Sequence, residues 1–150
     1  MKSLLRKLVL FITGYALYIA IEVTFRGYSY VLMGLCGGVL LMLIDEINEI
    51  LPWDTDILLQ SSLGSVLITF FELTVGEACK ISNIAPMWDY SNMLFNFDGV
   101  ICLEFSLLWV ILSFVAILLA DAINYYVFKL EPLPYYKLFG RTIIKFKEYK

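Results

Sequence analysis

The sequence predicts an all-α membrane protein: a four-helix antiparallel transmembrane bundle with an ordered outer loop between its third and fourth helices. Three observations indicate this fold class. Apolar residues make up 61% of the chain and charged residues 17%, against about a half and a quarter in soluble domains. Four long apolar segments follow one another. Nine of the eleven basic residues lie before the first segment or after the last.

The four expected spans are residues 8–25, 28–44, 57–75 and 99–128. A helix needs about 20 mostly apolar residues to cross the hydrocarbon core of a bilayer. The first segment follows a basic start, as a signal peptide does. However, it is long for one, carries Glu22 and lacks an A-x-A-like cleavage site. We therefore expect one integral membrane domain over residues 1–150.

The connections between the spans support this division. All four prolines lie outside the apolar segments, as helix breakers should: Pro52, Pro86, Pro132 and Pro134. The first connection, residues 26–27, is short enough to impose a tight helical hairpin. The second, residues 45–56, is acidic and holds Asp45, Glu46, Glu49, Asp54 and Asp56. The third, residues 76–98, is the longest and forms the expected outer loop.

The basic residues predict the orientation in the membrane. Lysine and arginine beside membrane spans favour the cytoplasmic side. Such residues open the chain at Lys2, Arg6 and Lys7. They recur in the tail, residues 129–150, at Lys129, Lys137, Arg141, Lys145, Lys147 and Lys150. Both termini are therefore expected in the cytoplasm. The tail is expected to meet anionic lipid headgroups, and residues 139–150 are expected to form either an interfacial helix or an unstructured segment.

Small and polar residues recur at helical spacing within the spans, which predicts helix packing. The second span carries a G-x-x-x-G pair, Gly34 and Gly38. The third carries Ser61, Ser65, Thr69, Glu72 and Gly76, and the fourth carries Cys102, Ser106, Trp109 and Ser113. Near the inner end of the fourth span, Asp121 and Asn124 are expected to cap the bundle or to meet Asp45 and Glu46.

Two carboxylates within the spans are not explained by packing of small residues. A charged group at membrane depth is costly, so Glu22 and Glu72 must pair, become protonated or face water. One interpretation is structural: Glu22 pairs with Arg26 four residues later, and Glu72 is a hydrogen-bonded packing residue. The other is a proton-linked or ligand site near the outer face. Its candidate residues are Glu22, Arg26, Glu72, Asp89, Asn96, Cys102 and Ser106.

The most distinctive motif lies between residues 88 and 109. It reads Trp88-Asp89-Tyr90-Ser91, then Phe95-Asn96, Gly99-Val100-Ile101-Cys102, Phe105-Ser106 and Trp109. This order resembles the family of small bacterial inner-membrane proteins labelled putative ABC-transporter type IV, or putative ABC transporter permease. Arg26-Gly27-Tyr28-Ser29 and Glu72-Leu73-Thr74-Val75-Gly76 resemble other elements of that family. Leu94, Val100 and Glu104 depart from it.

The resemblance implies a multi-pass, permease-like transport component, with a substrate that the sequence does not specify. An ABC permease requires a separate ATPase subunit, because this chain has no G-x-x-x-x-G-K-[ST] motif. Membrane lipids and further membrane subunits, including copies of this chain, are the other expected partners. Nucleic acid is not expected as one.

Two alternatives to transport remain at this stage. One is an intramembrane enzyme that acts on a lipid or polyprenyl substrate, with carboxylates as acid and base and Cys102 as nucleophile. The other is a structural or regulatory subunit of a membrane complex, docked through Gly34 and Gly38. The chain has no histidine and its cysteines have no metal-ligand spacing. We therefore expect no metal and no cofactor. The missing histidine and metal motifs count against an enzyme, and that alternative stays open.

Overall fold

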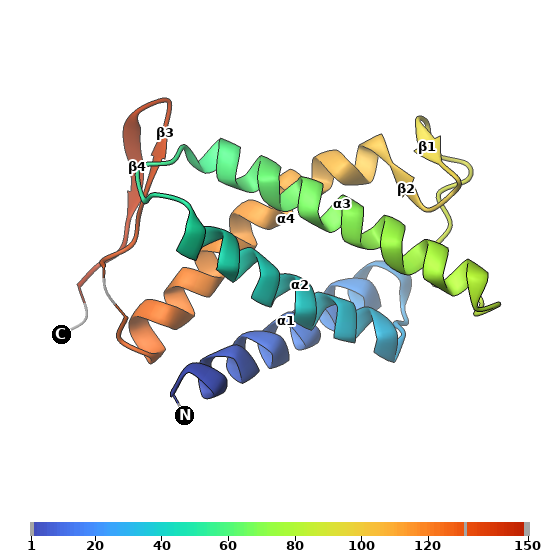
Figure 1. Ribbon diagram of the computed structural model, residues 1–150, viewed down its shortest axis with the longest axis horizontal. Helices are drawn as coiled ribbons and strands as arrows, with labels where there is room; N and C mark the ends of the chain where they lie inside the picture. The colour runs from blue at the N-terminus through green and yellow to red at the C-terminus, as the bar shows by residue number, and fades with distance from the viewer. Residues whose placement is uncertain (1, 131, 149–150) are drawn as a thin grey trace.

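The computed structural model describes residues 2–130 and 132–148, and it is built mainly of four helices (Figure 1). These are α1 (Lys2–Arg26), α2 (Val31–Ile50), α3 (Ile57–Ile81) and α4 (Leu103–Ala122). A π-helical turn, η1 (Ile123–Val127), continues α4. Lys150 lies outside the described residues, as do the side chains of Lys2 and Glu49.

Local sequence explains where the helices begin and end. Gly27 adopts a φ of 79° and ends α1, a conformation that costs glycine little. Pro52 follows the extended C-cap of α2, and the Asp56 carboxylate caps α3 by accepting from the Leu58 amide at 2.9 Å. The helix α4 starts at Leu103, later than the expected residue 99, because the preceding residues are extended.

Three segments within the described residues are long and apolar enough to cross a membrane. They are Ser3–Arg26, Ile57–Ile81 and Leu103–Val127. The helix α2 is not among them. It is apolar from Val31 to Ile44 and then carries Asp45 and Glu46, so its crossing stays a prediction, as do the membrane sides of the two termini.

The helices α1 and α2 pack closely because glycines remove side chains from their interface. A Cβ added at Gly37 would lie 2.4 Å from the Cβ of Tyr18, and one added at Gly38 would lie 2.7 Å from the Phe11 ring. A Cβ at Gly34 would meet the Tyr15 ring at 2.6 Å. The G-x-x-x-G pair is therefore occupied within the chain and presents no open face to another protein.

The helices α3 and α4 form a second pair, held by small and hydroxyl side chains. Gly64 leaves room for Ser113, whose Oγ would lie 2.6 Å from an added Cβ. Ser65 donates to the Ser106 carbonyl at 2.5 Å, and the hydroxyls of Thr69 and Ser106 are 3.0 Å apart. The small and polar residues that recur at helical spacing in α3 and α4 therefore serve to pack the two helices together.

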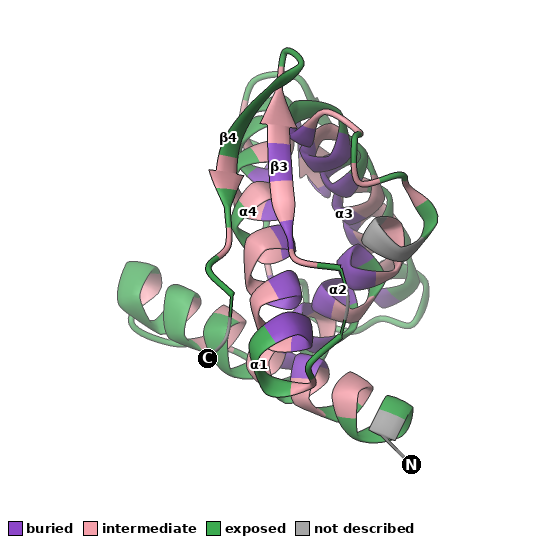
Figure 2. Ribbon diagram, turned by 90° about the vertical axis from the view of Figure 1, so that its left-hand side faces the viewer, coloured by how far each residue is buried: buried purple, intermediate pink, exposed green. Residues whose placement is uncertain are grey.

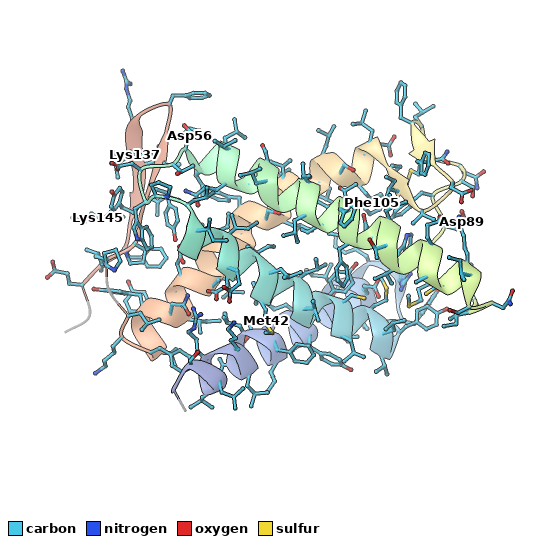
Figure 3. All side chains as sticks on the ribbon, in the orientation of Figure 1. Met42, Asp56, Asp89, Phe105, Lys137 and Lys145 are labelled. Carbon is cyan, nitrogen blue, oxygen red and sulfur yellow. The ribbon has the colours of Figure 1, made fainter. Side chains whose placement is uncertain are left out.

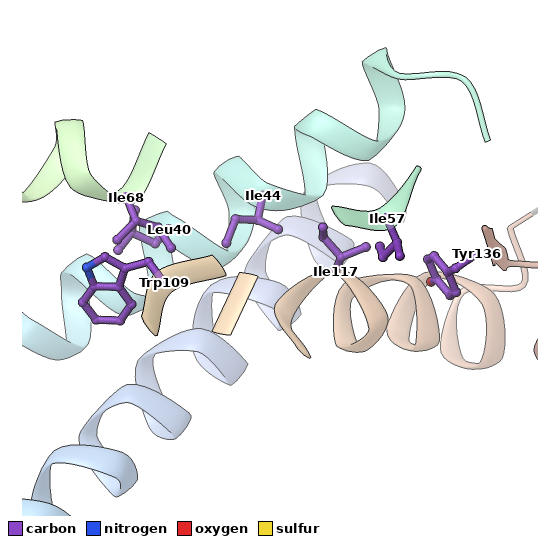
Figure 4. Close-up of a cluster of buried hydrophobic side chains, with 7 residues drawn as sticks. All are labelled: Leu40, Ile44, Ile57, Ile68, Trp109, Ile117 and Tyr136. Atoms are coloured by element: carbon purple, nitrogen blue, oxygen red, sulfur yellow. The ribbon is translucent and has the colours of Figure 1, made fainter. Parts of the chain in front are cut away.

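The main apolar core lies where α2, α3, α4 and the C-terminal hairpin face one another, and the buried residues gather there in Figure 2. Its buried members are shown in Figure 4 and are Leu40, Ile44, Ile57, Ile68, Trp109, Ile117 and Tyr136.

A buried polar cluster joins three helices at the end of the molecule where the chain begins. Arg6 of α1 forms a 3.0 Å salt bridge with Asp45 of α2, which is 1% exposed. Asn124 of η1 donates to Asp45 at 2.6 Å and accepts from Arg6 at 3.3 Å. The meeting of Asn124 with Asp45 was among the sequence-based expectations. Asp121 instead accepts from the Tyr136 hydroxyl at 2.5 Å.

The expectation of a helical or unstructured tail was wrong. The tail contains an antiparallel β-hairpin formed by β3 (Tyr135–Leu138) and β4 (Arg141–Lys145), so the fold is not purely α-helical. Phe139 and Gly140 turn the chain with φ values of 49° and 76°, and a turn glycine between alternating residues is a hairpin signal. On β3 this alternation directs Tyr136 into the core.

The acidic connection between α2 and α3 receives this hairpin. Asp54 accepts from the Tyr135 hydroxyl at 2.8 Å and from Lys137 Nζ at 2.5 Å. Hydrogen bonding to Lys137 holds the pKa of Asp54 below its usual range. Asp56, already the cap of α3, also accepts from the Phe139 amide at 2.6 Å. Asp54 and Asp56 thus have basic, phenol and backbone partners from the tail.

The packing of α2 on α1 predicts that Gly38→Ala destabilises the protein. The added Cβ would stand 2.8 Å from the Phe11 carbonyl oxygen, a backbone atom that cannot rotate away. We expect a loss of about 1–3 kcal/mol in the free energy of unfolding, measured by thermal unfolding in detergent. Leu35→Ala, on the exposed side of α2, is the control. An equal loss in both variants would show that the contact with α1 is not the cause.

Docking of the hairpin predicts unequal effects of two tyrosine substitutions on β3. Tyr136→Phe leaves the buried Asp121 without the phenol donor and should cost about 1–3 kcal/mol of stability. Tyr135→Phe removes a hydroxyl that bonds to exposed Asp54 and should cost much less. Limited proteolysis after the lysines of the hairpin, with thermal unfolding in parallel, compares them. Similar behaviour of the two variants would contradict the proposed burial.

Candidate functional site

The loop of residues 82–102 connects α3 to α4 and contains the short antiparallel pair β1 (Asn96–Phe97) and β2 (Ile101–Cys102). We call the end of the molecule where it lies the loop end, and the opposite end, with β3 and β4, the hairpin end. Trp88 Nε1 donates to the Val100 carbonyl at 2.8 Å, and the Tyr90 amide donates to the Gly99 carbonyl at 2.8 Å. The loop thus folds against its own second half.

Asp89 and Asn96 shape the turns of this loop. Asp89 accepts from the Ser91 amide at 2.9 Å and from the Ser91 hydroxyl at 2.5 Å, which keeps the pKa of Asp89 low. Asn96 donates to the Met93 carbonyl at 2.8 Å and accepts from the Gly99 amide at 3.1 Å. Both side chains use these bonds within the loop, and Asp89 lies at the loop end in Figure 3.

Glu72 is the buried carboxylate of the loop end. Its Oε1 accepts from the Tyr90 hydroxyl at 3.1 Å, and its Oε2 accepts from Trp109 Nε1 at 2.8 Å. The side chains belong to α3, the loop and α4, and each is less than 9% exposed. We call Glu72, Tyr90 and Trp109 the Glu72 centre. Phe105, labelled in Figure 3, stacks on Tyr90 at a centroid distance of 4.5 Å and covers the centre.

The donors of the Glu72 centre are both neutral. Burial raises the pKa of the Tyr90 phenol, and the neighbouring Glu72 carboxylate raises it further, so Tyr90 remains a protonated donor. Among the described residues, no lysine or arginine forms a salt bridge with Glu72. Buried charges are normally paired. A proton or a cation at Glu72 would therefore lower the cost of burying this carboxylate.

A small pocket adjoins Glu72 between the two helix pairs. Its cavity volume is ≈ 10 Å³, about the space that one water needs. The α1–α2 pair supplies Tyr18, Met33, Cys36 and Leu40; the α3–α4 pair and the loop supply Ile68, Phe71, Glu72, Val75, Trp88 and Trp109. The lining is thus aromatic and apolar, with one carboxylate.

The expected salt bridge between Glu22 and Arg26 is present, at 2.8 Å. Ser29 also donates to Glu22, at 2.6 Å. Arg26 in turn donates to the Met87 carbonyl at 3.0 Å, and its guanidinium lies 4.9 Å from the centre of the Tyr28 ring. Arg26 therefore joins the α1–α2 turn to the loop after α3.

The structure divides the candidate residues into separate groups. Glu72 belongs to the pocket, whereas Glu22 and Arg26 form their own cluster. Ser106 lies in the α3–α4 contact, and Cys102 is buried at the N-cap of α4 as a free thiol. Among the residues searched, no group of three or more histidine, cysteine or acidic side chains could hold a metal ion.

Sequence reasoning missed several residues of the pocket. Tyr90 was singled out within the W-D-Y-S motif, but its bond to Glu72 was not foreseen. Cys36, Met33 and Phe71 line the pocket although nothing in the sequence marks them as polar or catalytic. A buried aromatic or sulfur-containing residue looks the same in sequence whether it faces another helix or a cavity.

Comparison with known proteins gives one family match. A family model described as putative ABC-transporter type IV matches residues 22–145. The match begins at Glu22 and ends with β4, so it contains the Glu72 centre, the loop and both strands of the hairpin. No curated protein and no solved structure gives a significant match to the chain.

The link through Arg26 predicts a change in the exposure of Cys79. This thiol is 6% exposed and packs with Met33 and Met87, and Arg26 holds the Met87 carbonyl. In a variant whose only cysteine is Cys79, Arg26→Gln should increase the rate at which a maleimide modifies the thiol. Lys80→Gln, which removes exposed contacts to Glu77 and Asp98, is the control. A rate unchanged by Arg26→Gln would show that Arg26 does not restrain the loop.

Proposed function

We propose a transport function, because the chain belongs to the putative ABC-transporter type IV family and has three described segments able to span a membrane by length and composition. The chain would be a permease-like component with four spans, in which α2 is the fourth. Both termini and the hairpin end would face the cytoplasm, as the basic residues at the ends of the chain favour. The loop end would then face outward.

The observation that carries the proposal is the position of Glu72. This carboxylate lies at a pocket between the two helix pairs, hydrogen-bonded to neutral donors and without a salt bridge among the described residues. An ionisable group within a membrane segment is by default a functional candidate, since its burial costs several kcal/mol. We propose that Glu72 makes the pocket selective for positive charge.

Transport would require either movement of the helix pairs within this chain or additional subunits. A cavity of ≈ 10 Å³ is far below the several hundred Å³ of typical small-molecule sites. A translocation path would therefore need the helix pairs to move apart or other subunits to join the chain. We propose an assembly with further membrane subunits, and a separate ATPase as the energy-supplying partner, because this sequence lacks the phosphate-binding loop.

Cys36 allows a direct test, because this thiol lines the pocket. The test uses a variant with Cys79 and Cys102 replaced by alanine. Positively charged aminoethyl methanethiosulfonate should modify Cys36 faster than negatively charged sulfonatoethyl methanethiosulfonate, relative to their rates with a free thiol. A unit charge roughly 10 Å away at an effective dielectric of about 20 changes the rate of each reagent on the order of tenfold, in opposite directions for the two charges.

Glu72→Gln should remove this preference, and Glu77→Gln is the matched control. Glu77 is also on α3, but it is partly exposed and paired with Lys80, so its loss should leave the preference intact. A charge preference that survives Glu72→Gln would rule out Glu72 as its source. A Cys36 that no reagent modifies would argue against a pocket accessible to solutes.

A further inference from the structure

We propose that the pocket beside Glu72 binds a small organic ammonium cation through its primary ammonium group. This inference rests on the proposed function, since it names the class of ligand for the same site. It follows from three properties of the lining residues: their charge, their aromatic rings and the space between them.

The charge of the lining selects a cation. Among the described residues, Glu72 is the only acidic side chain that lines the pocket, and no lysine, arginine or histidine lines it. Each oxygen of Glu72 accepts one hydrogen bond, although a carboxylate oxygen has two lone pairs. The carboxylate therefore keeps acceptor capacity for an ammonium N–H. An anionic ligand would meet a negative charge with nothing to offset it.

The aromatic side chains favour an organic cation over an alkali ion. Tyr18, Phe71, Trp88 and Trp109 line the pocket, and the faces of such rings attract cations within about 6 Å. Alkali ions instead need oxygen atoms that replace their hydration shell. Besides Glu72, the pocket's side chains offer one oxygen atom, the Tyr18 hydroxyl. An ammonium group retains donors for Glu72 and can also contact the rings.

The size of the pocket limits the head group. A cavity of ≈ 10 Å³ accommodates about one water, which is comparable to a primary ammonium group. A tetramethylammonium ion is several times larger and would force Tyr18 of α1 away from Phe71 of α3. The structure thus favours a primary amine over a quaternary one, even though aromatic walls alone would accept both.

Protection of Cys36 tests the proposal on the solubilised full chain with Cys36 as its only cysteine. The measured quantity is the rate at which the neutral reagent methyl methanethiosulfonate modifies the thiol. The rate is compared in methylammonium, sodium and tetramethylammonium chloride at equal ionic strength. Methylammonium should slow the reaction severalfold and saturably, and sodium or tetramethylammonium should not. Glu72→Gln should abolish the protection, whereas Glu77→Gln should retain it.

A second variant keeps the test valid if Glu72→Gln does not fold. Phe71→Leu preserves Glu72 and both of its donors but removes one aromatic face, so it should raise the methylammonium concentration for half-protection severalfold. Unchanged protection in Phe71→Leu would overturn the role of the aromatic walls.

The remaining outcomes separate this inference from the proposed function. Cation-selective labelling of Cys36 without protection by methylammonium would overturn the ligand class and leave the charge-selective pocket in place. Equal protection by sodium would also overturn it, in favour of an inorganic cation. Loss of both charge selectivity and protection in the unmodified site would overturn both proposals.

Discussion

Burial of the Glu72 carboxylate is the constraint on which the loop end depends. A carboxylate in an apolar bundle needs hydrogen-bond donors, and two are supplied from different parts of the chain. Trp109 comes from α4, which packs directly on α3, but Tyr90 comes from the loop. The loop must therefore fold so that the Tyr90 phenol points inward, and the turns made by Asp89 and Asn96 produce that fold. Through these turns the two polar loop residues position Tyr90.

The contacts that hold the two helices of a pair together differ from the contacts that join one pair to the other. Within a pair, glycines and hydroxyl side chains permit close approach, as at Gly38 on Phe11 and Gly64 on Ser113. Between the pairs, the contacts are larger apolar side chains such as Leu40, Ile68 and Ile117. Small residues give close, shape-specific packing, whereas larger apolar chains can repack at lower cost. The pocket lies at this interface between the pairs.

The sequence alone predicted the helices well because their signals are strong and local. Long apolar runs located α1 to α4, with ends that differ from the observed ones by up to about six residues. Glu22 and Arg26 paired as their spacing indicated. The C-terminal hairpin was missed because Ile143, Ile144 and Phe146 among basic residues also match an interfacial helix. Contacts such as Tyr136 with Asp121, or Asp54 with Lys137, depend on the tertiary fold. The sequence singled out Glu72 because burying a charged carboxylate at membrane depth is costly. No local pattern, however, reveals that Tyr90 reaches Glu72 or that Cys36 lines the same pocket.

The polar contacts at the two ends indicate where the helix pairs can separate. At the hairpin end, Asn124 binds Asp45, which is 1% exposed and paired with Arg6. Separating the pairs would remove the Asn124 hydrogen bonds from this buried ion pair, and a buried polar group that loses a partner costs about 1–3 kcal/mol, more when it is charged, so this junction resists opening. At the loop end, the pairs are joined by apolar packing of Met33 with Cys79 and Met87 and through Arg26, whose side chain is 27% exposed and can exchange its bond to the Met87 carbonyl for water. Separation is therefore easier at the loop end, where the pocket and Glu72 lie. With the hairpin end as a fixed pivot, such a movement would enlarge the pocket without disturbing the Glu72 centre, because Glu72, Tyr90 and Trp109 all belong to the α3–α4 pair and its loop.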